Sequence, residues 1–520
     1  MPGKHSVRKI VAVGAVLLAL AAASSPGDAA RTPVSEGPQV LQLPPVPPVP
    51  PVLQLPPASP VLQAPPEPPA PEFATVSKLM NDAIAARRLP GAVVVIGHGG
   101  KVVFHQAYGS RKLDGEQGLD GSPAPAEPMT EDTIFDLASL TKCLATATAI
   151  MQLYEQGKVA FDDPVQKYLP DFNPANDPQR AEVTVRMLLT NTSGEGIDVS
   201  LGDPWGLAGA DKTEGVHRAL SIPLQSGPGA AFRYSDINYI LLGALLEKVT
   251  GDPEDVYVQQ NIFAPLGMND TRYLPAAKAC GPHGIRGAAV TWAPSPVRRE
   301  PESCPAGAWD ASLLPRIAPT ALDEESRADP AENPDYGYLL RGTVHDPTAR
   351  RMGGVAGNAG VFATAHDVGG YAQALLDRLA GRPSTFPLRP ATLELMTTPQ
   401  QPGHTAHQLE AANQAARTTN YPAISGQNLF GFGWDIDTGF SRPRGTVFPV
   451  GSFGNTGFTG TTLWMDPGSD TYVVLLSNSI HLRGSPPISD LRGEVATAAA
   501  QALRLYGSAP RPGRVDKPRR

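Results

Sequence analysis

The stretch that most restricts how this chain can fold runs from Leu140 to Leu153, where Lys142 is the only charged residue. The stretch ends close to Gly157, a residue typical of helix C-termini. A helix that is apolar on nearly all sides has no face to turn toward water, so it belongs inside a protein. The sequence therefore predicts a buried helix with a lysine near its start.

Segments with strand-like alternation lie on both sides of a helical middle part. A helix predicted over 73–89 leads into two β-branched runs that flank Gly99-Gly100, a hairpin signature. Helical patterns then cover 185–194, 234–251, 255–263, 365–381 and 388–398. Alternation returns at FGFGWDID, GTTLWMDPG and TYVVLLSNS, before a last helix at about 488–506. This order predicts an α+β fold with an antiparallel sheet formed by both chain ends, an inserted helical subdomain, and a site in the cleft between them.

The two ends of the chain differ from the middle. Residues 1–30 begin with basic residues and an apolar run shorter than the ~20 residues of a membrane-spanning helix, which predicts a signal peptide. An uncleaved N-terminal anchor is the alternative. Residues 31–72 are rich in proline and predict a disordered, extended linker. The predicted catalytic domain spans 73–507 with an irregular insertion at about 276–334, and 508–520 form a basic tail.

Net charge limits the kinds of partner that the protein can bind, and the few cysteines and histidines limit the disulfides and metal sites that it can form. The formal net charge of −7 argues against a nucleic-acid surface. We expect a monomeric protein exported to the bacterial periplasm or beyond, with no transmembrane span after signal removal, acting on a small molecule or a peptidoglycan peptide. Cys143 should be a packed apolar residue, whereas Cys280 and Cys304 either form a disulfide or remain free thiols. His404 and His407 lack a carboxylate at metal-ligand spacing, so a solvated loop is expected there.

The first candidate for chemistry is Ser139-Leu140-Thr141-Lys142, because residues three apart share a helix face. A serine hydroxyl becomes a strong nucleophile when a neighbouring base takes its proton. Lys142 is such a base only when neutral, and we expect burial in an almost uncharged helix to depress its pKa from ~10.4. The alternative is that Ser139 only caps the helix.

The second candidate is Tyr234-Ser235-Asp236, at the start of another apolar helix. A tyrosine phenol relays protons when cationic neighbours lower its pKa. The alternative is that Ser235 or Asp236 caps the helix and that Tyr234 packs against the core.

The third candidate is Asn455-Thr456-Gly457-Phe458, which leads into a strand. Gly457 would let the strand edge approach a ligand closely. The Phe458 amide would then complete an oxyanion-binding pair with the Ser139 amide. Taken alone, the segment is a turn followed by a strand.

Together the three segments resemble the β-lactamase-related serine hydrolases, which include class C β-lactamases, DD-peptidases of similar shape and related carboxylesterases. The order S-x-x-K, Y-S-D/N and [H/K]-T-G carries the resemblance, which covers roughly residues 73 to 507. Other similar stretches are LLTNTSG, FRYSDINYILLG, IFAPLGMNDT, GGVAGNAGVFATAHDV and GNTGFTGTTLWMDP. The RGTVHD segment at 341–346 looks most like the penicillin-binding-protein 4B branch, which is assigned to D-Ala-D-Ala carboxypeptidases.

The resemblance implies a β-lactamase/transpeptidase-like fold and cleavage of an ester or amide through a serine acyl-enzyme. The substrate would be a peptidoglycan D-Ala peptide, a β-lactam or a carboxylic ester. Ser139 would be the nucleophile, and Lys142 and Tyr234 would share the general-base work. The implied substrate-binding and oxyanion residues are Asp236, Asn455, Thr456, Gly457 and Phe458. Neither a cofactor nor a metal is implied.

Two residues depart from the family pattern. Asn455 stands where relatives commonly have Lys or His, and it brings no positive charge to lower the pKa of Tyr234 or Lys142. Asp236 replaces a frequent Asn and, if unpaired, would raise these pKa values. Both departures argue against a strong β-lactamase. They leave open a second interpretation, a catalytically weakened homologue that acts as a peptidoglycan- or partner-binding module.

Overall fold

The computed structural model describes residues 71–291, 304, 307–401 and 428–507. The predicted signal peptide, all but the last two residues of the Pro-rich linker, the basic tail, and His404 and His407 lie outside the described residues. The predicted domain boundaries therefore stay predictions. In the described part of the chain, no helix is both long and apolar enough to cross a membrane.

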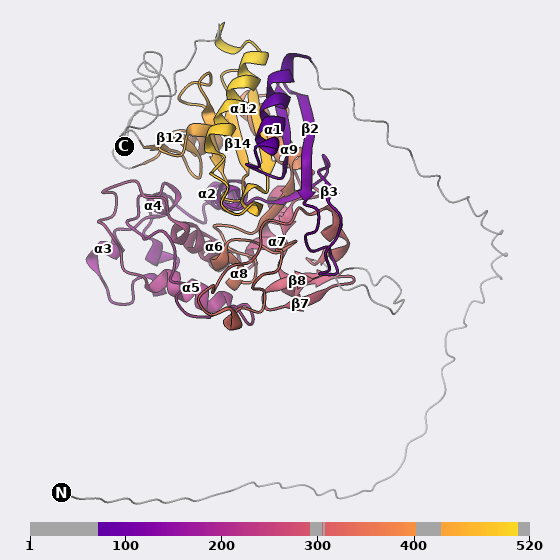
Figure 1. The fold of residues 1–520 in the computed structure, drawn as a ribbon. Coiled ribbons are helices and arrows are strands. Elements are labelled where there is room, and N and C mark those ends of the chain that lie inside the picture. Colours follow the sequence, from indigo (N-terminus) through magenta and orange to yellow (C-terminus); the bar gives the residue numbers. More distant parts are fainter. Residues whose placement is uncertain (1–70, 292–303, 305–306, 402–427, 508–520) are drawn as a thin grey trace, which may run out of the picture. The chain divides into compact units, whose positions relative to one another are not determined.

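One large antiparallel sheet is formed by the two ends of the described chain (Figure 1). Its strands are β1 (Gly91–His98), β2 (Lys101–Lys112), β3 (Glu127–Pro128), β11 (Leu429–Phe430), β12 (Asp435–Asp437), β13 (Phe453–Thr456), β14 (Thr462–Asp466) and β15 (Thr471–Ser477). The order is β11-β12-β13-β14-β15-β1-β2-β3, so the first long strand pairs with the last one. This arrangement confirms the predicted α+β fold class.

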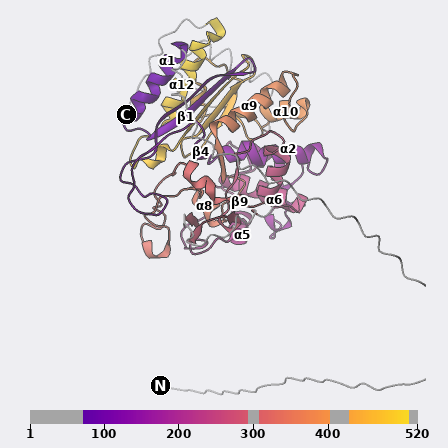
Figure 2. The same ribbon diagram turned by 90° about the vertical axis from the view of Figure 1, so that its right-hand side faces the viewer.

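Both faces of this sheet are covered. Successive side chains of a strand point to opposite faces, so one strand contributes to the core on each side. Val93 and Val95 of β1 belong to the main core, whereas Val94 and Ile96 belong to a second, smaller core. Helices α1 (Ala74–Ala85) and α12 (Ser489–Ala502) lie on the second side and α9 (Ala365–Leu379) on the first (Figure 2). The turn between β1 and β2 is Gly99-Gly100, and both glycines have positive φ angles, of 60° and 80°.

The helical subdomain is inserted between the two halves of the sheet. Its helices are η2 (Lys142–Ala147, a π-helix), α2 (Thr148–Glu155), α3 (Pro178–Ala181), α4 (Val185–Leu189), α5 (Lys212–Ser221), α6 (Asp236–Thr250), α7 (Glu254–Val258), η5 (Gln259–Phe263, a π-helix) and α8 (Pro347–Arg351), with α10 (Pro390–Thr397) beside α9. The segment from Thr141 to Leu153 is buried throughout, as predicted from its composition. Helices α3, α5 and α8 were not predicted.

A small sheet, β4 (Ile134–Asp136), β10 (Val361–Thr364) and β5 (Arg272–Tyr273), leads into the buried helix. Among its described residues, the predicted irregular insertion contains the short strands β6 (Ala279–Cys280), β7 (Gly284–Arg286), β8 (Ala289–Thr291) and β9 (Trp309–Asp310), with one 3-10 turn before β6 and two after β9. Cys280 and Cys304 form a disulfide, and Cys143 is a buried free thiol.

Candidate active site

Ser139 lies at a sharp turn between β4 and the buried helix. The preceding residue, Ala138, has a φ of +46°, a left-handed conformation that is uncommon for a residue with a side chain. The Asp136 carboxylate accepts a hydrogen bond of 2.9 Å from the Ala138 amide and holds this turn. The chain thus keeps a strained backbone directly before the serine, as is common at functional sites.

The Ser139 hydroxyl is contacted by the two side chains that the sequence had singled out. Lys142 Nζ lies 3.0 Å from Ser139 Oγ, and Tyr234 Oη donates to the same oxygen at 2.7 Å. Among the residues that the structure describes, no backbone amide donates to Ser139 Oγ. The hydroxyl is therefore not a helix cap, whereas Ser235 does cap α6 by accepting from the Asn238 amide at 3.2 Å.

Lys142 is buried and paired. Its ammonium lies 2.6 Å from the Asp236 carboxylate and donates to the Asn358 carbonyl at 2.9 Å. Burial alone would lower the Lys142 pKa, but the charges of Asp236 and Tyr234 and their hydrogen bonds raise it above its ordinary value. The expected depression of this pKa is wrong, because the only charge on the helix meets a carboxylate from another helix.

Tyr234 is also in its protonated form at neutral pH. Burial raises the pKa of its phenol to about 12, and the Lys142 cation only partly opposes this shift. The ring packs against Phe440, with 5.6 Å between the ring centroids. The resting site therefore holds a cationic lysine and a neutral phenol around a neutral serine.

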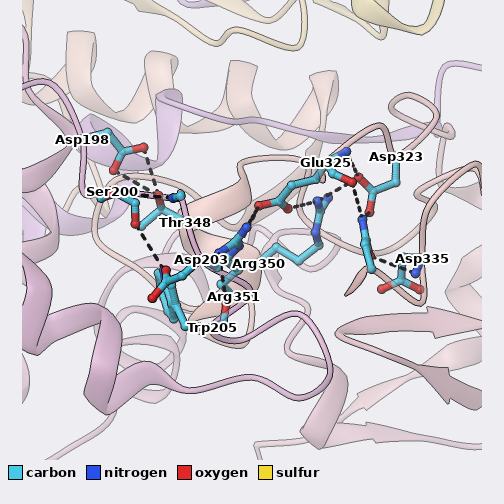
Figure 3. A network of polar contacts seen from close by, with 12 residues as sticks. Asp198, Ser200, Asp203, Trp205, Asp323, Glu325, Asp335, Thr348, Arg350 and Arg351 are labelled. Atoms are coloured by element: carbon cyan, nitrogen blue, oxygen red, sulfur yellow. Dashed lines mark hydrogen bonds and ion pairs between the residues drawn. The ribbon is translucent and has the colours of Figure 1, made fainter. Parts of the chain in front are cut away.

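Two further carboxyl groups, which the sequence had not indicated as site residues, lie close enough to influence this pair. Burial, together with Asp346 and Asp236, raises the pKa of Asp198 to about 8, and burial and Asp236 raise that of Asp346 to about 6. Asp198 accepts from the Thr348 hydroxyl at 3.0 Å (Figure 3). Asp236 thus carries the negative charge nearest to Lys142, with protonatable carboxyl groups behind it.

The turn after β13 is fixed against the residues that precede Ser139. The hydroxyls of Thr459 and Thr461 donate to the carbonyls of Asp136 and Leu137, at 2.7 and 2.9 Å. At Gly457 a Cβ atom would clash with Thr461 Oγ1 and with the Leu137 carbonyl, so only glycine fits. The third motif and the serine turn therefore form one rigid unit.

Two amides of this unit remain available. Within the described ranges, neither the Ser139 nor the Phe458 N–H has a hydrogen-bond partner. Unpaired amides at neighbouring turns are the donors that an oxyanion hole requires. This is the arrangement that the third motif predicted, and its catalytic use remains a proposal.

The side chain of Asn455 is occupied by hydrogen bonds to the backbone, whereas Thr456 is half-buried at the end of its strand. Asn455 is 9% exposed, donates to the Gly433 carbonyl at 3.0 Å and accepts from the Thr456 amide at 2.8 Å. Its amide group thus holds the strand end in place and supplies no contact to Lys142 or Tyr234 in the described structure. Thr456 is half-buried at the end of β13, opposite Thr462.

Apolar side chains surround the site at the surface. Ile197, Phe440 and Phe458 are 63%, 56% and 72% exposed, and each adjoins a site residue in the sequence or in space. Phe458 also stacks with His345, at 6.1 Å between the rings, beside a cavity of about 640 Å³. Exposed aromatic residues around a polar centre are typical of a ligand-binding rim.

Ion pairs hold several residues that line this cavity. Figure 3 shows Arg350 and Arg351 of α8 bonded to acidic residues near the end of the insertion. Arg350 contacts Asp323 at 3.0 Å, and Arg351 contacts Glu325 at 2.6 Å. Asp323, Glu325 and Arg350 line the cavity, so this network fixes its shape.

The chain is similar to known proteins of one family over most of its length. The family model described as Beta-lactamase matches residues 76–496. A protein of Escherichia coli (strain K12) named "Putative D-alanyl-D-alanine carboxypeptidase" is 29% identical over 414 residues, which are 77% of this chain and 80% of that protein. A protein of Bacillus subtilis (strain 168) named N-acetylmuramyl-L-alanine amidase is 29% identical over 420 residues, 78% of this chain and 80% of its own length.

Solved structures share the fold at lower identity. EstCE1, a hydrolase with promiscuous acyltransferase activity, is 24% identical with a TM-score of 0.53, covering 82% of this chain and 98% of its own. An octameric penicillin-binding protein homologue from Pyrococcus abyssi is 23% identical with a TM-score of 0.52, covering 83% of this chain and 77% of its own. These similarities confirm the fold.

Proposed function

This chain belongs to the Beta-lactamase family, and from that premise we propose that it is an exported serine hydrolase that cleaves an ester or amide through an acyl-enzyme. The observation that carries the proposal is the set of contacts at one oxygen. Ser139 Oγ lies between Lys142 Nζ and Tyr234 Oη, and the unpaired amides of Ser139 and Phe458 lie at two neighbouring turns. A nucleophile, proton-accepting groups and oxyanion donors are the parts that acyl transfer needs.

In the proposed reaction, Ser139 Oγ attacks the substrate carbonyl carbon and its proton passes to the Lys142–Tyr234 pair. The amides of Ser139 and Phe458 stabilise the oxyanion of the tetrahedral intermediate. The intermediate collapses to an ester of Ser139, and the leaving group departs with the proton held by the pair. Water then attacks the ester, gives up a proton by the same route and restores the free serine.

The resting site requires one earlier proton movement. Lys142 is cationic, and the 2.6 Å contact to Asp236 is short enough for its proton to pass to the carboxylate. A bound substrate that excludes water from the site would favour the neutral amine and carboxylic acid over the ion pair, because surroundings of low polarity disfavour charged groups. Lys142 would then be an amine able to accept the serine proton.

The proposed substrates are D-alanyl peptides of peptidoglycan, β-lactams or carboxylic esters. The names of the carboxypeptidase and amidase relatives favour a cell-wall peptide. The exposed Phe440 and Phe458 favour an apolar group next to the scissile bond. The third motif carries Asn455 instead of a cation, which favours esters and peptides over rapid β-lactam turnover.

Export is proposed from residues 1–30, whose sequence has the layout of a signal peptide. Cell fractionation of the full chain and of a variant lacking residues 1–30 tests this. Export requires that the full chain, and not the shortened one, is found outside the cytoplasm.

A second candidate function is a binding module for peptidoglycan peptides. The observation that favours it is the raised pKa of Lys142, which leaves no free base in the resting site. This module would bind substrate peptides without turning over p-nitrophenyl esters above the Ser139→Ala background.

The decisive experiment is covalent labelling with a fluorophosphonate or a penicillin probe. The wild type and a Ser122→Ala variant, which alters an exposed loop serine, should be labelled equally. Ser139→Ala should not be labelled. Equal labelling of Ser139→Ala rejects the assignment of the nucleophile, and binding without a p-nitrophenol burst supports the second candidate.

A further inference from the structure

Arg492 of α12 reaches the back of the turn that carries the third motif. Its Nη2 donates to the Gly457 carbonyl oxygen at 2.7 Å. Its Nε has no hydrogen-bond partner and the guanidinium pairs with no carboxylate among the residues that the structure describes. Burial without a counter-charge lowers the pKa of Arg492 to about 10, so the group is still a cation at neutral pH.

The Gly457 carbonyl and the Phe458 amide belong to one peptide group. In a trans peptide the C=O and N–H bonds point in opposite directions. A carbonyl that faces Arg492 therefore turns the Phe458 N–H away from α12. The Cα of Gly457 lies against Leu137 and Ala138, the two residues directly before Ser139, so the Gly457–Phe458 peptide group adjoins the serine turn.

We propose that Arg492 is a positioning residue that polarises the Gly457–Phe458 peptide and so strengthens the Phe458 N–H as an oxyanion donor. The proposal rests on the proposed acyl-enzyme function. Hydrogen bonds in a chain strengthen one another, and a cation at the carbonyl draws electron density from the amide hydrogen. The charge lies behind the donor, where it acts on the oxyanion without touching substrate.

A purely structural role explains these contacts less well. The turn is already held by the Gly457 amide to the Thr461 carbonyl at 2.8 Å, and the Gly460 amide donates to the Gly457 carbonyl at 3.1 Å. The two threonine hydroxyls fix the turn to the serine segment as well. A half-buried cation that has no carboxylate partner among the described residues is costly to keep, which favours a functional reason for its presence.

The test uses the full-length protein and its acyl-enzyme, formed with a penicillin that has a ¹³C-labelled β-lactam carbonyl. In the wild type, the infrared carbonyl band of the acyl-enzyme reports the strength of the oxyanion hydrogen bonds. Arg492→Met should shift this band to higher frequency and lower kcat on p-nitrophenyl esters on the order of tenfold with KM unchanged, less than the loss of a whole oxyanion donor. Arg442→Met, which removes an exposed arginine paired with Asp490, should change neither.

A second variant separates charge from shape. Arg492→Lys keeps a cation that is titratable, so its band should match the wild type at neutral pH and move toward the Arg492→Met position as pH rises. A wild-type band position in Arg492→Met would overturn the inference while leaving the acyl-enzyme intact. A wild type that forms no acyl-enzyme band and shows no burst of p-nitrophenol from an ester would instead reject the proposed function.

Discussion

The side chains of Lys142 and Asp236 form an ion pair between two helices, with Lys142 1% and Asp236 16% exposed. The pair joins the nucleophile-bearing turn to the first turn of α6, where the Asp236 amide also donates to the Ile197 carbonyl at 2.7 Å. The carboxylate holds the lysine in its charged form. The affinity of Lys142 for its proton is therefore set by a residue from another helix.

Asp236→Asn should shift the pH dependence of activity. Removing the negative charge lowers the Lys142 pKa, because the carboxylate is what raises it above the ordinary value. Lys142 acts as a base only after it has lost its proton, so a lower pKa makes the neutral amine available at lower pH. The acid limb of kcat/KM for a p-nitrophenyl ester should move down by about one to three pH units.

The matched control for this change is Asp490→Asn, since Asp490 is 67% exposed and pairs with Arg442 far from Lys142 in the sequence. Its pH profile should equal that of the wild type. An acid limb that stays in place in Asp236→Asn, or moves to higher pH, contradicts the role given to the pair.

Tyr234→Phe should slow catalysis and leave substrate binding almost unchanged. The phenol donates to Ser139 Oγ, whereas the ring packs against Phe440 and would keep that contact as phenylalanine. Loss of a positioned proton relay lowers kcat by about 10² to 10⁴. Steady-state kinetics would measure this, and a decrease of only a few-fold would show that Lys142 moves the proton alone.

Gly457→Ala should slow acylation strongly without unfolding the domain. The new methyl group would meet Thr461 Oγ1 and the Leu137 carbonyl, so the turn must move away from Ser139. Displacing an oxyanion donor costs about 10² to 10³ in rate, which the burst phase of p-nitrophenol release would detect. Gly370→Ala on α9, where a methyl group meets no atom, is the control, and unaltered bursts in both variants would refute the prediction.

Glu195→Gln should change how stability depends on pH. The Glu195 side chain is fully buried, and both of its oxygens lack a hydrogen-bond partner within the described residues. Burial raises its pKa from 4.5 to about 7, and the Arg180 guanidinium, 3.4 Å from the carboxylate, opposes this shift only in part. The folded protein holds this proton more tightly than the unfolded chain. The stabilisation that the protonated Glu195 carboxyl gives to the folded protein is therefore fully present below pH 4.5, and it is lost as pH rises through 7.

Urea unfolding of the wild type and of Glu195→Gln at pH 4.5 and 8 measures this difference. Between these pH values the wild type should lose up to about 3 kcal/mol more unfolding free energy than the variant. Glu394→Gln, on the exposed side of α10, should follow the wild type. Parallel curves for Glu195→Gln and the wild type would mean that Glu195 is charged in the folded protein across this range.

Local features of the sequence were sufficient to predict the main elements. Helix α6 has a serine cap, an apolar run and Gly251 at its end with a φ of 80°, all within one short segment. Helix α5 was missed because it is polar and contains Gly215, although Asp211 and Glu214 have the spacing of a helix N-terminus. The order of segments predicted a sheet formed by both chain ends, but the order of strands within that sheet was not predicted, because pairing between distant strands leaves no local signal.

The residues of the site could be predicted from the sequence, but their protonation states could not. Ser139, Lys142 and Tyr234 were singled out by spacing, and the structure brings them together. The direction of the Lys142 pKa shift depends on which way Asp236 points, and a sequence does not contain that information. Asp198 and Arg492 belong to no motif, so only coordinates could associate them with the site.

The pairing of β1 with β15 has a consequence for synthesis. A ribosome produces β1 early, but its partner emerges only when the chain has been made to Ser477. Until then one edge of the N-terminal hairpin is unprotected, and such edges are prone to aggregation. Contacts between residues this distant in the sequence form slowly. A stop codon anywhere before Thr471 removes β15 and leaves β1 without its partner, so even such a late truncation should prevent the sheet from forming.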